Sequence, residues 1–195
     1  MRAWLLAGAV SLCACGTPMP GTDGGVMPLS VTRVDAGCAI TIEEWASAGQ
    51  QHVPTSSSPT WPSNPPASGP HFPVWAAFQE FSSPVPRGYW VHDLEHGAIV
   101  LLHRCDGLDA ATCDGVKAAL RQASASLSDD PKCTAPIRVR TVITPDPLLT
   151  EPLVAVSWRF IYRAACVDQP SLEAFVKAHY AQAPEDECAN GVTSF

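Results

Sequence analysis

Runs of apolar residues predict the strands of this protein. Residues 98–103 (A-I-V-L-L-H) form an unbroken apolar run, which predicts a buried strand. Residues 137–143 alternate apolar side chains with Arg138 and Arg140, which predicts a strand with one solvated face. Residues 153–162 predict a further strand, separated from the previous one by a proline-containing turn.

Apolar residues at helical spacing predict two long helices. One such set comprises Val116, Ala119, Leu120, Ala123 and Leu127. The other comprises Leu172, Phe175, Val176, His179 and Tyr180. The first helix is expected to end before Pro131 and the second to begin near Pro170, because proline is disfavoured inside a helix. Residues 41–48 predict a further short helix, since Thr41 and Glu44 have the spacing of a capping box.

A long segment before these elements is rich in proline and aromatic residues. Prolines recur between residues 52 and 86, which disfavours both helix and central strand. The same segment carries large aromatic residues, which are typical of an ordered loop packed on a core: Trp61, Phe72, Trp75, Phe78 and Phe81. We therefore expect an α+β domain in which two helices cover a small mixed or antiparallel sheet, preceded by this long ordered loop.

The first residues have the pattern of an export signal. Arg2 precedes a short apolar run at residues 4–12, far below the ~20 residues of a membrane-spanning helix. The run ends in L-C-A-C-G, which resembles the bacterial lipobox and makes Cys15 the expected site of lipid attachment. Residues 1–15 are thus predicted to be a lipoprotein signal peptide, with an ordinary cleaved signal as the alternative. Cys13 is the other candidate for the lipid, but Leu12 before it fits the small-residue requirement poorly.

The rest of the chain divides into a predicted tether and one predicted domain. Residues 16–37 consist mainly of Gly, Pro, Ser, Thr and Asp, a composition that favours a flexible tether. Residues 38–195 then have the length of a single domain. The expected location is extracytoplasmic, on the outer membrane or the periplasmic face of a Gram-negative cell, with the membrane as a partner through the lipid.

The charge balance argues against nucleic acid as a partner. The formal net charge is −7, and no basic patch interleaved with aromatic residues is present. A solvated acidic surface explains this charge without any partner.

The cysteines predict disulfides formed in an oxidising compartment. Beside Cys13 and Cys15, the chain contains an even set: Cys38, Cys105, Cys113, Cys133, Cys166 and Cys188. Zinc binding is the alternative, but no C-x-x-C pair is present. As a hypothesis, the positions of the predicted elements suggest three pairs: Cys105–Cys113, Cys133–Cys166 and Cys38–Cys188.

The segment V-H-D-L-E-H-G at residues 91–97 is the first candidate for chemistry. In a strand, residues four apart lie ~13 Å apart, whereas in a helical turn His92, Glu95 and His96 share one face. Gly97 is well placed to end such a turn in a left-handed conformation. We therefore predict a helical turn that presents two imidazoles and a carboxylate, with Asp93 or Glu95 able to orient a ligating ring.

Two other histidines lie in proline-bounded loops. His52 opens the segment H-V-P, and His71 ends the segment N-P-P-A-S-G-P-H. Together with V-H-D-L-E-H-G, these motifs resemble an uncharacterised bacterial family, domain of unknown function 3105, which occurs in exported and membrane-tethered proteins. The resemblance extends over roughly residues 43–186. It implies that these histidines matter, and it implies no activity.

Three functions remain open from the sequence. The first is a transition-metal site for copper, zinc or iron, with these candidate ligands: His52, His71, His92, Glu95 and His96. The second is a non-catalytic interaction module with structural histidines. The third is a hydrolase in which Glu95 is the general base on metal-bound water. His103 and His179 are expected to be packing residues.

Overall fold

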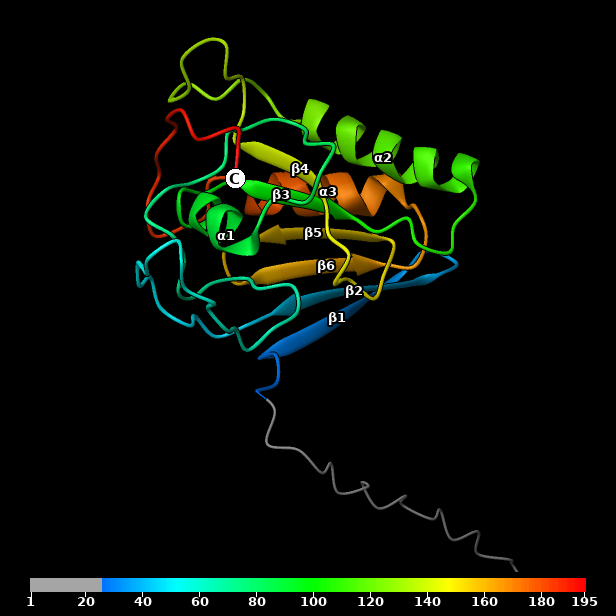
Figure 1. The fold of residues 1–195 in the computed structure, drawn as a ribbon. Helices are drawn as coiled ribbons and strands as arrows, with labels where there is room; N and C mark the ends of the chain where they lie inside the picture. Colours follow the sequence, from blue (N-terminus) through cyan, green and yellow to red (C-terminus); the bar gives the residue numbers. More distant parts are fainter. Residues whose placement is uncertain (1–25) are drawn as a thin grey trace, which may run out of the picture.

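The computed structural model describes residues 26–195, and the chain forms a single sheet flanked by helices (Figure 1). The strands of the described part are β1 Ser30–Asp35, β2 Ala39–Glu44, β3 Ile99–His103, β4 Thr141–Pro145, β5 Leu153–Ser157 and β6 Phe160–Ala164. The helices are α1 Arg87–Glu95, α2 Ala110–Ala125 and α3 Gln169–His179. The expected signal peptide, Cys15 and residues 16–25 of the expected tether lie outside the described residues.

The sheet is mixed, with the order β1-β2-β6-β5-β3-β4. Strands β3 and β4 are parallel, and all other neighbours are antiparallel. Helix α2 connects the parallel pair, as parallel strands require a long crossover. The predicted α+β fold with a small mixed sheet is therefore confirmed.

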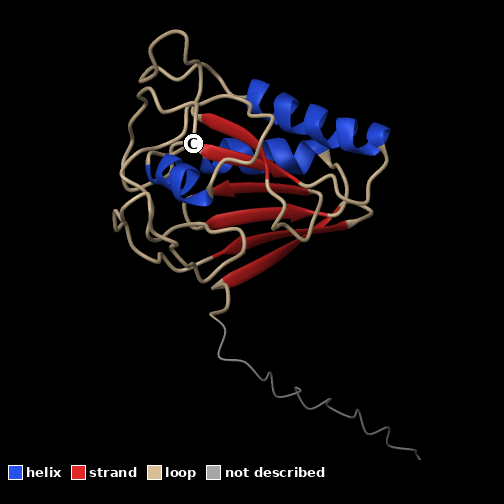
Figure 2. Ribbon diagram, in the orientation of Figure 1, coloured by secondary structure: helices blue, strands red, loops and turns tan. Residues whose placement is uncertain are grey.

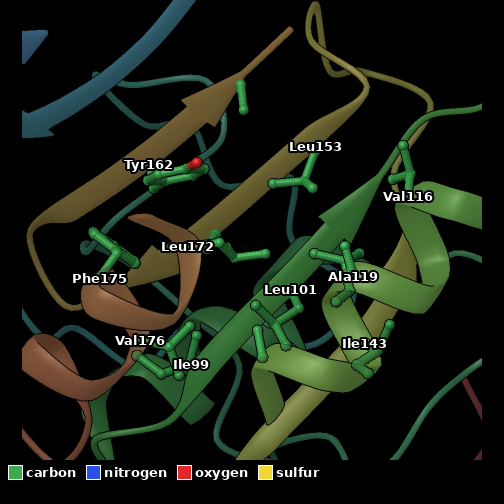
Figure 3. Close-up of a cluster of buried hydrophobic side chains, with 14 of the residues drawn as sticks. Ile99, Leu101, Val116, Ala119, Ile143, Leu153, Tyr162, Leu172, Phe175 and Val176 are labelled. Carbon is green, nitrogen blue, oxygen red and sulfur yellow. The ribbon is translucent and has the colours of Figure 1, made fainter. Parts of the chain in front are cut away.

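Helices α2 and α3 cover one face of the sheet (Figure 2). Alternate residues of β3, Ile99 and Leu101, point to this side and pack against Val116 of α2 and Val176 of α3 (Figure 3). Each of these side chains is at most 2% exposed. The two helices predicted from apolar spacing thus exist and bury the faces that the spacing indicates.

The opposite face of the sheet is covered by α1 and the proline-rich loop. The intervening β3 residues, Val100 and Leu102, pack here against Trp90 and Leu94 of α1. The loop adds further buried apolar side chains to the same core: Ala67, Ala76 and Val85. The expected long ordered loop is therefore part of the domain's second core, and it is held next to α1.

Two N-terminal predictions are wrong. Residues 41–48 do not form a helix, because Ala39–Glu44 is strand β2, paired on both sides by β1 and β6. Pairing in the sheet outweighs the local capping-box spacing. Ser30–Asp35, expected within the flexible tether, forms the edge strand β1.

Two strand predictions need correction. Strand β4 begins at Thr141, and Arg140, expected on a solvated face, is 1% exposed within a network of ion pairs. Residues 153–162 are not one strand. They contain β5 and the start of β6, joined by a tight turn in which Arg159 has φ +72°.

Disulfides join Cys38 to Cys166, Cys105 to Cys113 and Cys133 to Cys188. The Cys105–Cys113 pairing agrees with the sequence hypothesis, whereas the other two predicted pairs are wrong. Cys38 and Cys166 meet because β2 and β6 are neighbours and Ile40 lies opposite Ala164. This leaves Cys188 to bind Cys133 in the loop after α2.

The described residues include no helix with the length and apolar content required to cross a bilayer.

Candidate functional site

Helix α1 presents the histidine motif as a short helical turn against the sheet. His96 caps the helix, and Gly97 follows in the left-handed region with φ +84°. A Cβ atom at Gly97 would lie 2.9 Å from the Cα of Ala181, so glycine also permits a close backbone approach. The prediction of a helical turn ended by Gly97 is confirmed.

The two loop histidines are aligned by backbone hydrogen bonds. His52 and His71 form an isolated parallel bridge, in which the His71 N–H donates to Gln51 O at 2.9 Å. The N–H of Val53 donates back to His71 O at 2.8 Å. The N–H of Phe72 donates to Gly88 O at 3.0 Å, which joins this bridge to α1. Two loops and one helix therefore converge.

Three imidazole rings meet at this point. The ring centroids of His52 and His92 are 4.8 Å apart, those of His52 and His71 are 4.8 Å apart, and those of His71 and His92 are 4.7 Å apart. Glu95 Oε2 lies 2.8 Å from His71 Nε2 and 3.8 Å from His52 Nε2. One ligand atom from each of the four side chains lies within 4.8 Å of the others. Such spacing is compatible with a shared metal ion.

The four side chains differ in access to solvent. The side chain of His71 is fully buried and that of Glu95 is 3% exposed, whereas that of His52 is 52% exposed. His92 is also buried. The group is thus an interior cluster with one edge open to solvent at His52.

Backbone carbonyls fix the orientation of the two buried rings. His71 Nδ1 lies 2.8 Å from Gly69 O, and His92 Nδ1 lies 2.6 Å from Phe72 O. A carbonyl only accepts hydrogen bonds, so each Nδ1 carries a proton, and a ring with that single proton has its lone pair on Nε2. Metal-bound histidines are oriented in the same way.

Burial keeps His92 neutral. Desolvation lowers the pKa of His92 to about 4, although the hydrogen bond to Phe72 O acts in the opposite direction. The neighbouring imidazoles of His96, His71 and His52 lower this pKa further. His92 is therefore unprotonated at neutral pH, as a metal ligand must be.

His96 lies beside this group and faces other residues. Its Nε2 is 3.2 Å from Glu185 Oε2, and its group is completed by Glu187. Burial lowers the pKa of His96, against the effect of Glu185, Glu187 and Glu95. The structure thus brings four of the five predicted ligands together and places His96 in a second group.

Asp93 and Trp75 lie next to the site in positions that differ from, or were not included in, the sequence-based expectations. Asp93 is fully buried, its Oδ2 accepts from the Ala76 N–H at 3.2 Å, and burial raises the pKa of its carboxyl group. Asp93 was expected to orient a ligating histidine, but the backbone carbonyls of Gly69 and Phe72 orient His71 and His92 instead. The Trp75 ring contacts the rings of His92 and His96, with centroids 5.1 and 4.7 Å apart. Only the general aromatic content of the loop pointed to Trp75.

The chain matches one family model. That family is described as a protein of unknown function (DUF3105), and the match extends over residues 52–191. It begins at His52 and includes every residue of the two groups above. No curated protein and no solved structure matches the chain.

Proposed function

Because the chain belongs to the DUF3105 family, whose description names no activity, we propose a function from the geometry of the site. The domain binds one transition-metal ion through the imidazoles of His52, His71 and His92 and the carboxylate of Glu95. This ligand set replaces the five-residue set expected from the sequence, because His96 faces Glu185.

A single contact carries this proposal. His71 Nε2 and Glu95 Oε2 are 2.8 Å apart in the interior, yet Nε2 has no hydrogen-bond partner. If Nδ1 carries the only proton of His71, the lone pair on Nε2 faces a carboxylate oxygen. Two buried acceptors repel each other at this distance unless a cation lies between them.

That cation is either a proton on His71 or a metal ion. A proton on His71 explains only the contact between His71 and Glu95. It does not explain why His52 and His92 lie next to that contact. A protonated His71 would also place a positive charge 4.7 Å, between ring centroids, from the ring of His92. A metal ion uses all four ligand atoms, which is why the arrangement favours metal.

The donor set limits the kind of ion. Three imidazole nitrogens and one carboxylate oxygen suit zinc, copper or iron in divalent form. The group contains no thiolate, so it lacks the soft ligands that select copper(I). An exposed His52 leaves one edge at which a further ligand can approach.

The experiment uses asparagine in place of the buried histidines. In His71→Asn and His92→Asn the side-chain amide can still donate to Gly69 O or Phe72 O, but no Nε2 ligand remains. Full-length protein folded in an oxidising compartment is expected to contain about one equivalent of metal and to gain thermal stability from zinc. Both variants are expected to lose that metal and that gain.

His103→Asn is the matched control, because His103 is a buried histidine outside both groups. It is expected to keep the wild-type metal content. Wild-type protein that stays metal-free and gains no stability from zinc, copper or iron would show that the histidines are structural, as in the interaction-module reading.

We also propose that acylation of Cys15 anchors the protein to a membrane. The support is the L-C-A-C-G pattern after an apolar run, which lies outside the described residues. Membrane fractionation with Cys15→Ser, and the mass of the mature N-terminus, test this proposal. Wild-type protein without a lipid mass would refute it.

A further inference from the structure

We infer that His96, Glu185 and Glu187 form a second divalent-cation site beside the first. The proposal goes beyond the function proposed above, because it concerns a separate set of ligands. One ligand atom from each of these side chains lies within 4.8 Å of the others.

The buried imidazole separates this group from an ordinary acidic surface. The side chain of His96 is only 3% exposed, and its Nδ1 has no hydrogen-bond partner. Its Nε2 faces Glu185 Oε2 at 3.2 Å. One imidazole nitrogen of a buried ring and two carboxylates within 4.8 Å of one another form an N/O donor set for a borderline divalent ion such as zinc.

The two carboxylates lack a basic partner within the described part of the chain. Asp186, which lies between them in sequence, binds both Lys132 and Arg140. Glu185 has an ion-pair contact only with His96, and Glu187 has none with a lysine or arginine. The Arg140 guanidinium group lies close, since it donates to His96 O at 2.6 Å and to Glu187 O at 3.4 Å, but it forms its ion pairs with Asp130 and Asp186 rather than with the two glutamates.

The segment that carries these carboxylates is held in place on both sides. The Glu185 N–H donates to Glu95 O at 3.0 Å, which attaches the segment to the end of α1. Cys188 is bonded to Cys133, and Arg140 holds Asp186 at 2.8 Å. The ligands are thus positioned before an ion binds, which lowers the entropy lost on binding.

The second site differs from the first in access and charge. The side chain of Glu185 is 52% exposed, so an ion here keeps part of its hydration and is screened by salt. The rings of His92 and His96 are adjacent, with centroids 4.6 Å apart. An ion in the second site is therefore bound more weakly than one held by the buried ligands, and it exchanges faster.

Zinc titration of the full-length protein by calorimetry tests the inference. The wild-type protein is expected to bind two ions, with the weaker event at least tenfold weaker than the first. The Glu185→Gln, Glu187→Gln double variant is expected to lose the weaker event and keep the tighter one. The His71→Asn, His92→Asn double variant is expected to do the reverse.

A charge-matched control is Asp35→Asn with Asp114→Asn, which removes two exposed carboxylates far from the group in sequence. It is expected to retain both binding events. A wild-type protein that binds one ion and loses it in the His71→Asn, His92→Asn variant, or a Glu185→Gln, Glu187→Gln variant that still binds two ions, would overturn the inference. Failure of the first site has a different signature, namely a tighter event that persists without His71 and His92.

Discussion

Glu95 is the residue at which the two readings of the site make opposite predictions. Its carboxylate Oε2 lies 2.8 Å from His71 Nε2 in the interior. In Glu95→Gln the amide N–H can donate to that nitrogen, so the metal-free protein is expected to keep or gain stability. Zinc affinity is expected to fall at least tenfold. Thermal unfolding with a chelator and a zinc competition assay measure both quantities.

A protonated His71 paired with Glu95 predicts the reverse. Removing one partner of a buried ion pair costs about 3–5 kcal/mol, so the metal-free Glu95→Gln protein would be clearly destabilised. Zinc affinity would then be unaffected by the substitution. That pair of results would contradict the proposed metal site.

Arg140 forms buried ion pairs that stabilise the end of α1. Its guanidinium group binds Asp130 and Asp186, and it donates to His96 O at 2.6 Å at the end of α1. Arg140→Ala is expected to lower the free energy of unfolding by about 3–5 kcal/mol, because buried partners lose their counter-charge. Urea denaturation measures this loss.

Arg121→Ala is the comparison for Arg140→Ala. Arg121 forms a two-pronged ion pair with Glu80 on the surface, and such exposed pairs contribute little. Equal destabilisation by the two variants would contradict the assigned role of the buried network.

Among the elements, α1 is the one whose end fixes the position of the site. Gly97→Ala places a Cβ atom 2.9 Å from the Ala181 Cα and in a left-handed conformation. The conformation alone costs about 1–2 kcal/mol, and the contact adds to it. We expect a larger loss of thermal stability than this, together with weaker zinc binding.

Comparison with Gly107→Ala separates the effect of the Gly97–Ala181 contact from the cost of the left-handed conformation. Gly107 has φ +82°, close to that of Gly97, but a Cβ atom there meets nothing within 4 Å. It should show only the conformational cost and unchanged zinc binding. If the two variants behave alike, the close approach at Gly97 has no role in positioning α1.

Sequence reasoning succeeded for elements that carry their own pattern. The turn around His92 was predictable because residue spacing and a terminal glycine are local features. Strand β2 was missed because its pairing with β1 and β6 is not local, and a capping-box spacing occurred there by coincidence. The contact between Glu185 and His96 was missed because no local sequence pattern predicts it. It forms only because the C-terminal segment folds back onto the end of α1.

At the scale of the whole molecule, one disulfide joins distant parts of the chain. Cys38 and Cys166 are 128 residues apart in sequence and connect β2 to the end of β6. Cysteine spacing could not reveal this pairing, because strand order determines which cysteines meet. The site itself is assembled in the same way, from loops and a helix packed on one face of the sheet.

Removal of the Cys38–Cys166 bond by two alanines is expected to lower the free energy of unfolding by about 2–5 kcal/mol. Removal of Cys105–Cys113, which closes a loop with a separation of 8, is expected to cost less. Neither bond contains a proposed ligand, so the zinc affinity of folded protein should be unchanged. Guanidinium unfolding gives the stabilities, and the opposite order of the two losses would contradict the entropic argument.

The most direct test of the central claim is the coordination shell of the bound ion. X-ray absorption at the zinc edge, with one equivalent of zinc on the full-length protein, reports the donor atoms. We expect three imidazole nitrogens and at least one oxygen, with the imidazole scattering reduced in His92→Asn. A shell of sulfur or of oxygen alone, or a wild-type spectrum that neither His71→Asn nor His92→Asn changes, would contradict the proposed site.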